Sequence, residues 1–263
     1  MLKKILKYDL KYIYKGLTIF YILDICTAVI ARILMLIEKS TIATFLSSAL
    51  SLIAICLLFL TIGYNLLRLW NRFLNNFYKD ESYLTHTLPV EKKTLYTSKF
   101  ASTIITLATS TIVIVLSLAI IYYSKENIAL LKMTLEGLKD TYDNFVLYIL
   151  GMMFAIFFLE LISIVSAGYT GLLLGHKSND AKMVKSIIIA LAFFMGLSIA
   201  MLLVVFLTGL IIPDIMDLFM SNVEPGISTI KNVLSMELVL YALITIFYFI
   251  LDLHIFQKGV NVD

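Results

Sequence analysis

Six long apolar runs dominate this sequence and limit what the chain can fold into. Hydrophobic residues make up 60% of its 263 residues and charged residues 15%, against about 25% charged residues in soluble domains. A helix of about 20 apolar residues crosses the roughly 30 Å hydrocarbon layer of a bilayer and satisfies its own backbone hydrogen bonds there. We therefore predict an all-α, polytopic membrane protein that forms a single transmembrane domain over residues 1–263. Its six transmembrane helices are expected near residues 17–37, 43–67, 100–123, 145–174, 186–212 and 237–256.

The lysine and arginine residues predict how these spans are oriented. If both termini lie inside, fifteen of the 21 Lys and Arg residues fall on the cytoplasmic side and five fall outside. This bias follows the positive-inside rule. The first apolar run is also too long for the core of a signal peptide, so we expect it to remain as a span. The prediction is a multi-pass protein of the cell membrane with both the N-terminus and the C-terminus in the cytoplasm.

The first sixteen residues, MLKKILKYDLKYIYKG, are predicted to form a separate amphipathic helix. Lysines recur at every fourth position and so share one helix face: Lys3, Lys7, Lys11 and Lys15. Leucine and isoleucine fall largely on the other side. Such a helix lies in the membrane interface with its lysines toward anionic lipid headgroups, and Gly16 would end it. The alternative is an ordinary basic flank of the first span.

Residues 68–99 form a long polar stretch between the second and third predicted spans. An apolar stripe continues past the second span, so that helix is expected to extend into the cytosol. Asp80 and Glu81 then favour a new helix start, where negative charge is stabilising. Pro89 ends that helix because it lacks an N–H group and restricts the residue before it. The pattern predicts a short amphipathic helix over residues 80–87, held between two membrane helices.

This segment resembles the first cytoplasmic loop in permease subunits of ABC-2-type exporters from Gram-positive bacteria. The matching residues form four short groups: Asp80-Glu81-Ser82-Tyr83-Leu84, Thr87-Leu88-Pro89-Val90, Lys92-Lys93 and Ser98-Lys99. Members of that family usually carry glycine where Ser82 stands, and serine is also small. The predicted layout of six spans, an interfacial N-terminal helix and a large first cytoplasmic loop is similar over the full length, although only residues 78–99 are motif-like.

The resemblance implies that residues 80–87 form a coupling helix rather than a solvated loop without a partner. In that family the first cytoplasmic loop sits in a groove of a separate ATPase subunit, and two permease halves enclose the translocation path. The chain would bind two copies of a cytosolic ABC ATPase, pair with itself or with a similar permease, and export a hydrophobic or amphipathic substrate such as an antimicrobial peptide or a lipid. Tyrosine and leucine anchors among charges suit such an interface. The expected docking residues are Tyr78, Asp80, Glu81, Tyr83, Leu84, Thr87 and Pro89.

No motif in the sequence predicts an enzyme, a cofactor or a metal site. The nearest approach to a Walker A motif, at residues 171–178, has the wrong glycine spacing and no preceding strand, so ATP hydrolysis would fall to a partner subunit. The three histidines, His86, His176 and His254, are isolated from one another, which argues against a zinc-dependent intramembrane protease. We expect no nucleic acid as a partner.

Three charged residues inside the predicted spans are candidates for the translocation path: Asp24, Arg32 and Glu160. A charge at this depth is costly and usually faces protein or water. Asp24 and Arg32 share a helix face but lie about 12 Å apart along its axis, too far for a direct ion pair. Glu160 lies in the middle of the fourth run and is the best candidate for contact with a substrate. The alternative role for each is a buried structural group.

Two other classes of function stay open at this point. A secondary transporter or a channel-like protein would also place charge inside its spans, but such proteins tend to show inverted repeats, and we find no convincing repeat. A non-transporting immunity or sensor protein of the membrane is equally compatible with the composition.

Two further predictions concern packing away from the polar segment. Ala167, Gly171 and Gly175 repeat at every fourth position, which predicts close helix packing by the fourth span, within the chain by default. The outer loop at residues 213–236 contains the segment DIMDLFM, whose apolar spacing predicts a short helix that dips into the outer leaflet.

Overall fold

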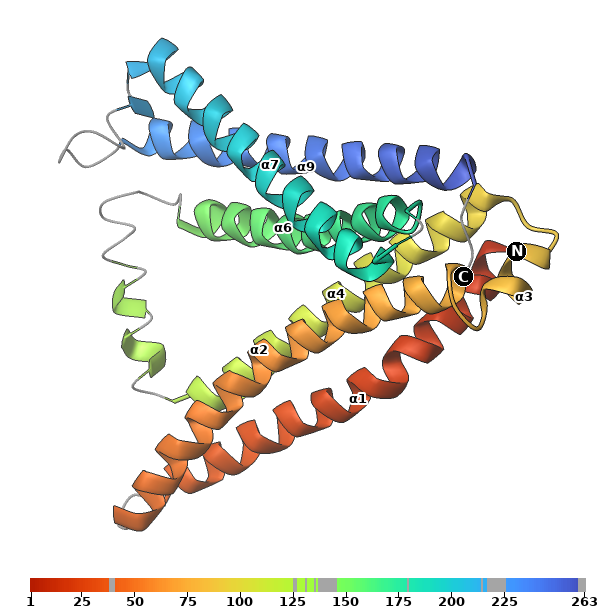
Figure 1. Ribbon diagram of the computed structural model, residues 1–263. Helices are drawn as coiled ribbons and strands as arrows, with labels where there is room; N and C mark the ends of the chain where they lie inside the picture. The colour runs from red at the N-terminus through yellow and green to blue at the C-terminus, as the bar shows by residue number, and fades with distance from the viewer. Residues whose placement is uncertain are drawn as a thin grey trace. The chain divides into compact units, whose positions relative to one another are not determined.

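The computed structural model describes residues 1–37, 41–124, 127–130, 132–134, 136, 146–178, 180–213, 215–216 and 226–259. The labelled elements within these ranges are all α-helices (Figure 1). They are α1 (Leu2–Met35), α2 (Thr41–Phe77), α3 (Ser82–Thr87), α4 (Lys92–Tyr122), α6 (Val146–Gly175), α7 (Lys182–Ile211) and α9 (Ile227–Gln257).

Six of these helices are long and apolar enough to cross a membrane. They are all the labelled helices except α3, and each covers most of one predicted span. The all-helical class and the six membrane-length helices are therefore confirmed. The helix predicted from the DIMDLFM segment lies almost entirely outside the described residues.

The residue contacts divide the chain into two compact units, and the single transmembrane domain over residues 1–263 stays a prediction. Unit 1 comprises residues 1–133 and contains α1, α2, α3 and α4. Unit 2 comprises residues 134–263 and contains α6, α7 and α9. Each unit therefore brings together three membrane-length helices, and unit 1 adds the short helix α3.

In unit 1, α1 packs along both α2 and α4 (Figure 1). The predicted helix end at Gly16 does not occur, because α1 continues without interruption from Leu2 to Met35. The reason is packing: Asp9, Ile13 and Gly16 are all buried. A methyl group at Gly16 would overlap the hydroxyl of Tyr64, so glycine serves a close helix contact here rather than a helix stop. The four lysines of the N-terminal stripe remain exposed.

The three long helices of unit 1 all continue past their predicted spans at the end where α3 lies. α1 begins at Leu2, α2 runs on to Phe77 and α4 begins at Lys92, which extends each by about two turns or more. Figure 1 shows α3 and the N-terminus of the chain at this same end of unit 1. These polar extensions carry the candidate site.

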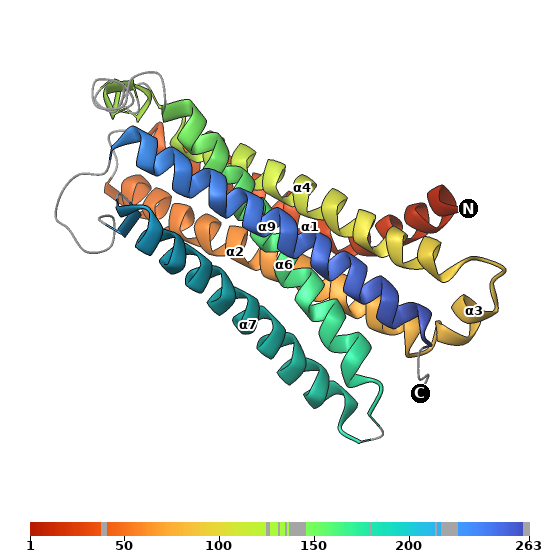
Figure 2. The same cartoon turned by 90° about the horizontal axis from the view of Figure 1, so that it is seen from above.

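In unit 2, α6 packs against both α7 and α9, whereas α7 and α9 make few contacts with each other (Figure 2). Two glycines bring α6 close to α7. A Cβ atom at Gly171 would overlap the Ser186 carbonyl oxygen, and one at Gly175 would meet the Ser186 backbone. The small-residue repeat of the fourth span therefore packs within the chain, as predicted.

Candidate functional site

The α3 segment is a short helix held between the ends of two long ones. α2 ends at Phe77, and its last carbonyls are capped by the backbone N–H groups of the following turn. α3 then forms one and a half turns, and Leu88 is extended immediately before Pro89, with φ −65° and ψ 137°. This is the conformation that a following proline favours. A helix therefore lies within the predicted residues 80–87; it begins at Ser82 and ends two residues before Pro89.

One face of α3 points outward. Tyr83 is 76% exposed and Leu84 is 67% exposed, and Asp80, Thr87 and Pro89 are exposed as well. Exposed tyrosine and leucine side chains at the polar end of a membrane protein are the kind of surface that a protein partner covers. Five of the seven predicted docking residues thus lie on an accessible surface.

Of the other two predicted docking residues, Tyr78 is buried and Glu81 is half-exposed with its carboxylate bonded to α2. Tyr78 is only 1% exposed, so its side chain is part of the core of unit 1 and is not available to a partner. Glu81 precedes α3, and its carboxylate bonds to Arg72 and Asn76 of α2. The sequence pattern could not separate the two faces, because α3 is too short to show a helical period.

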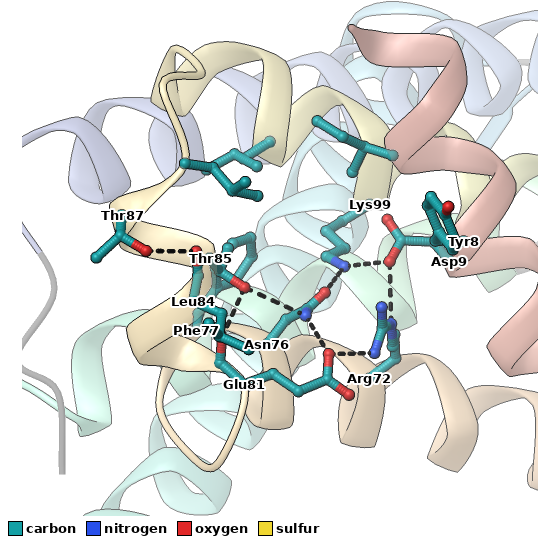
Figure 3. Close-up of a pocket in the computed structure, with 13 residues that line it drawn as sticks. Tyr8, Asp9, Arg72, Asn76, Phe77, Glu81, Leu84, Thr85, Thr87 and Lys99 are labelled. Atoms are coloured by element: carbon teal, nitrogen blue, oxygen red, sulfur yellow. Dashed lines mark hydrogen bonds and ion pairs between the residues drawn. The ribbon is translucent and has the colours of Figure 1, made fainter.

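Five side chains form a closed network beneath α3, which we call the Asp9 network: Asp9, Arg72, Asn76, Glu81 and Lys99 (Figure 3). Asp9 Oδ1 accepts a hydrogen bond from Arg72 Nε at 3.0 Å and another from Lys99 Nζ at 2.5 Å. Glu81 Oε2 accepts one from Arg72 Nη1 and one from Asn76 Nδ2, both at 2.6 Å. Lys99 also donates to Asn76 Oδ1, which closes the circle. The network joins α1, α2, α4 and the turn before α3.

Most of this network is withdrawn from water. Asp9, Arg72 and Lys99 are buried, and only the Glu81 side chain, 44% exposed, reaches solvent. Ser98 Oγ donates to the second oxygen of Asp9 at 2.9 Å. Two cations and a hydroxyl therefore satisfy one buried carboxylate. Such charged hydrogen bonds are short and directional, and removing one partner would leave an uncompensated buried charge. The network thus favours one mutual arrangement of these helices.

Tyr12 adds a second link between α1 and α2. The Cζ atoms of Arg68 and Arg72 lie 4.1 Å and 4.6 Å from the centroid of the Tyr12 ring. Arg68 Nη2 also donates to the Tyr12 carbonyl oxygen at 3.0 Å. Guanidinium groups over an aromatic face are attracted to it, so the extension of α1 is held to α2 at two successive turns.

A cavity of about 470 Å³ lies between the first turns of α1, α3 and the start of α4. Its apolar lining comes from both sides: Ile5 and Tyr8 from α1, Leu84 and Leu88 from the α3 segment, and Leu95 from α4. The Asp9 network forms most of its polar lining, and Thr85 and Thr87 add two hydroxyl groups (Figure 3). Because the charges of the network bond to one another, the cavity presents no unmatched cluster of one sign.

The three intramembrane candidates lie in different places. Asp24 is buried in unit 1, where its Oδ2 accepts a hydrogen bond from Thr61 at 2.7 Å; its Oδ1 has no partner among the described residues. Arg32 is half-buried in the last turn of α1. Glu160 belongs to unit 2, on α6, where it interacts electrostatically with Glu237 of α9. Asp24 and Arg32 therefore belong to unit 1, and Glu160 belongs to unit 2.

Sequence reasoning missed Asp9, which is the hub of the network. One signal was present: Asp9 is the single acidic residue among the first sixteen. It lies two positions from Lys7 and from Lys11, and therefore on the opposite face of the helix. A lone carboxylate opposite a lysine stripe indicates an ion pair with another element. It does not indicate which one.

Among the described residues, no group of three or more His, Cys, Asp or Glu side chains could hold a metal ion. Comparison with known proteins found no protein-family model, no curated protein and no solved structure that matches the chain.

Proposed function

We propose that the chain is the membrane-spanning permease subunit of an ATP-driven, ABC-2-type exporter of the cell membrane. In this proposal both termini and α3 lie in the cytoplasm, and α3 is the coupling helix that docks on a separate ABC ATPase. The observation that carries the proposal is the build of α3: it exposes Tyr83 and Leu84 on one side and is tied on the other side, through Glu81, to buried charges of the long helices.

This build suits a part that transmits force. The turn before α3 is bonded to α2, and α2 and α4 each run as one helix from the α3 segment into a membrane-length apolar run. α2 has 37 residues, so it measures about 55 Å at 1.5 Å per residue. When two ATPase subunits close on ATP, a movement of α3 would tilt these helices and rock the transporter between its states.

The remaining parts of the proposal concern partners and cargo. The permease would bind two ATPase subunits and pair with a second copy or a similar permease. Its cargo would be hydrophobic or amphipathic, such as an antimicrobial peptide or a lipid. Asp24, Arg32 and Glu160 stay proposed residues of the translocation path, since each is a charged residue on a helix of membrane length.

The test is retention of an ATPase during purification. The tagged chain is co-expressed with the ATPase candidate encoded beside it, recognised by a GxxxxGK[ST] motif and an ABC signature. The wild type should retain this ATPase in detergent, and the double variant Tyr83→Ala with Leu84→Ala should lose it. The matched control is Leu116→Ala with Tyr123→Ala, which removes an exposed leucine and an exposed tyrosine from the other end of α4.

Two results would contradict the proposal. One is a wild-type protein that never retains the ATPase. The other is a Tyr83 and Leu84 double variant that retains as much as the control. Transport driven by an ion gradient without ATP would favour a secondary transporter instead.

A further inference from the structure

We propose that Asp9 is a positioning residue that makes the N-terminal turns of α1 move together with α3. The force path runs from Glu81 through the Asp9 network to α1. This inference rests on the proposed function, because it names the helix that a docked ATPase would move. It also gives the first turns of α1 a mechanical role that their lysine stripe alone does not suggest.

Side chains of α2 and α4 link α3 to α1 through hydrogen bonds beside an open cavity. The cavity of about 470 Å³ has Ile5 and Tyr8 on its α1 side and Leu84 and Leu88 on its α3 side. These side chains border open space, so packing between them is incomplete. The hydrogen-bonded network at the same cavity does connect the two elements.

Two routes of hydrogen bonds connect Glu81 to Asp9. One route runs from Glu81 through Arg72 to Asp9. The other runs from Glu81 through Asn76 and Lys99 to Asp9. Glu81 and Asp9 are the two points that both routes share. A closed circle of short, directional bonds resists sliding and rotation better than a single ion pair does.

The buried charges of the Asp9 network need an explanation other than stability. A buried ion pair can often be replaced by apolar residues of similar volume with no loss of stability. Stability alone therefore gives little reason to bury Asp9 and Lys99. A fixed register between α1 and α3 gives a reason, because bonds between specific atoms define a position that apolar contacts leave adjustable.

The consequence is that α1 would be driven over its full length. α1 is one helix of 34 residues without a break at Gly16, and it packs against both α2 and α4. A displacement of α3 that reaches Asp9 therefore reaches the helix that touches the other two long helices of unit 1.

The experiment measures the distance between α1 and α3 with spin labels in the full-length, detergent-purified chain. Cys26 and Cys56 are first replaced by alanine, and labels are placed at the exposed positions of Lys7 and Tyr83. The parent should give one narrow distance distribution. The decisive variant is Asp9→Leu with Lys99→Met, which removes one anion and one cation and leaves the Arg72–Glu81 pair in place. It should fold with near-parental stability and lose the narrow distribution.

The matched control is Asp24→Leu with Thr61→Val. It replaces another buried carboxylate of α1 and its hydrogen-bond partner on α2, but neither residue belongs to the network. It should keep the narrow distribution. The inference is overturned if the Asp9 and Lys99 variant stays narrow, or if the control broadens to the same extent. Both variants are measured on the chain alone, without an ATPase.

Substrate transport per ATP hydrolysed is a second measurement, and it distinguishes a failure of this inference from a failure of the proposed function. With the ATPase bound, the Asp9 and Lys99 variant should still retain it, because Tyr83 and Leu84 are unchanged, but should move less substrate per ATP hydrolysed. Unchanged transport per ATP would overturn the mechanical role. If the wild type retains no ATPase, the proposed function fails, whereas the distance measurement still decides whether Asp9 couples α1 to α3.

Discussion

The two units of this protein hold three long helices together by different means. In each unit the first helix, α1 or α6, packs against both others. In unit 1 the packing of α1 on α2 and α4 is fixed at one end by the Asp9 network. All the ion pairs observed among the described residues belong to this network. In unit 2 the α6–α7 contact depends on Gly171 and Gly175, which let the helix backbones approach closely.

This difference bears on how each unit can move. Close contacts through glycine and small side chains gain dispersion energy and hold helix backbones together without ion pairs. Bonds among buried charges fix specific atoms, and a shift that breaks them exposes an unpaired charge. In the proposed function, unit 1 is the unit that receives a directed force at its α3 end and passes it on.

The largest expected effect comes from breaking the charge balance in unit 1. Asp9→Asn removes the carboxylate that pairs with Lys99 and, of the two that pair with Arg72 in the described part of the chain, one. Leaving such cations buried costs about 3–5 kcal/mol of unfolding free energy. Unfolding in mixed detergent, followed by loss of helical circular dichroism, measures it. Lys11→Gln, at an exposed lysine of the same helix, should change stability by less than about 0.5 kcal/mol. Equal effects of the two variants would contradict a special role for the network.

The next largest effect is expected from the glycine contact of unit 2. A methyl group at Gly171 would overlap the Ser186 carbonyl oxygen and lie 2.6 Å from Cβ of Ala190. Because backbone atoms cannot move aside easily, Gly171→Ala should cost about 1–3 kcal/mol, as overpacking does. Gly196→Ala is the matched control, since a Cβ atom there meets nothing within 4 Å. The same unfolding measurement applies, and a tolerated Gly171→Ala would show that α6 and α7 are not held by close approach.

A smaller loss of stability is expected from removing one threonine–carboxylate hydrogen bond in each unit. This comparison tests whether the two units also differ away from the Asp9 network and the glycine contact. Each has a buried threonine that donates to a carboxylate: Thr61 to Asp24 at 2.7 Å in unit 1, and Thr170 to Asp252 at 2.6 Å in unit 2. Thr61→Val and Thr170→Val should each cost about 0.6–1.7 kcal/mol, the range for hydrogen bonds between membrane helices. Thr18→Val, which loses only an exposed bond to its own helix, is the control. A cost for either buried threonine no larger than that of the control would contradict the expectation.

The local features of this fold could be predicted from the sequence, because they depend on neighbouring residues. Hydrophobic run length predicts the six long helices, and Pro89 predicts where α3 ends. The fourth-position repeat of small residues predicts close packing of α6. In each case the sequence signal lies within the helix that it describes or directly beside it.

The Asp9 network could not be predicted in this way. Asp9 lies 63 residues from Arg72 and 90 from Lys99 along the chain, and no local periodicity encodes which helices meet. The same limit explains the errors at Gly16 and Tyr78. Glycine ends a helix in isolation but permits close contact with Tyr64 here, and tyrosine in a polar loop is exposed unless a neighbouring helix covers it.

The smallest effect on stability is expected on the outward face of α3, and it separates that face from the network beneath it. Tyr83 and Leu84 are 76% and 67% exposed, so replacing both by alanine removes little buried contact and should change the unfolding free energy by less than about 0.5 kcal/mol. The unfolding curves of this double variant and of Asp9→Asn, recorded in the same detergent, measure the contrast directly. If the outward face serves a partner, stability and ATPase retention respond to different residues: Asp9 governs the first, and Tyr83 with Leu84 governs the second. A large loss of stability in the Tyr83 and Leu84 variant would place these side chains in the core of unit 1, and α3 would then have no free face with which to dock.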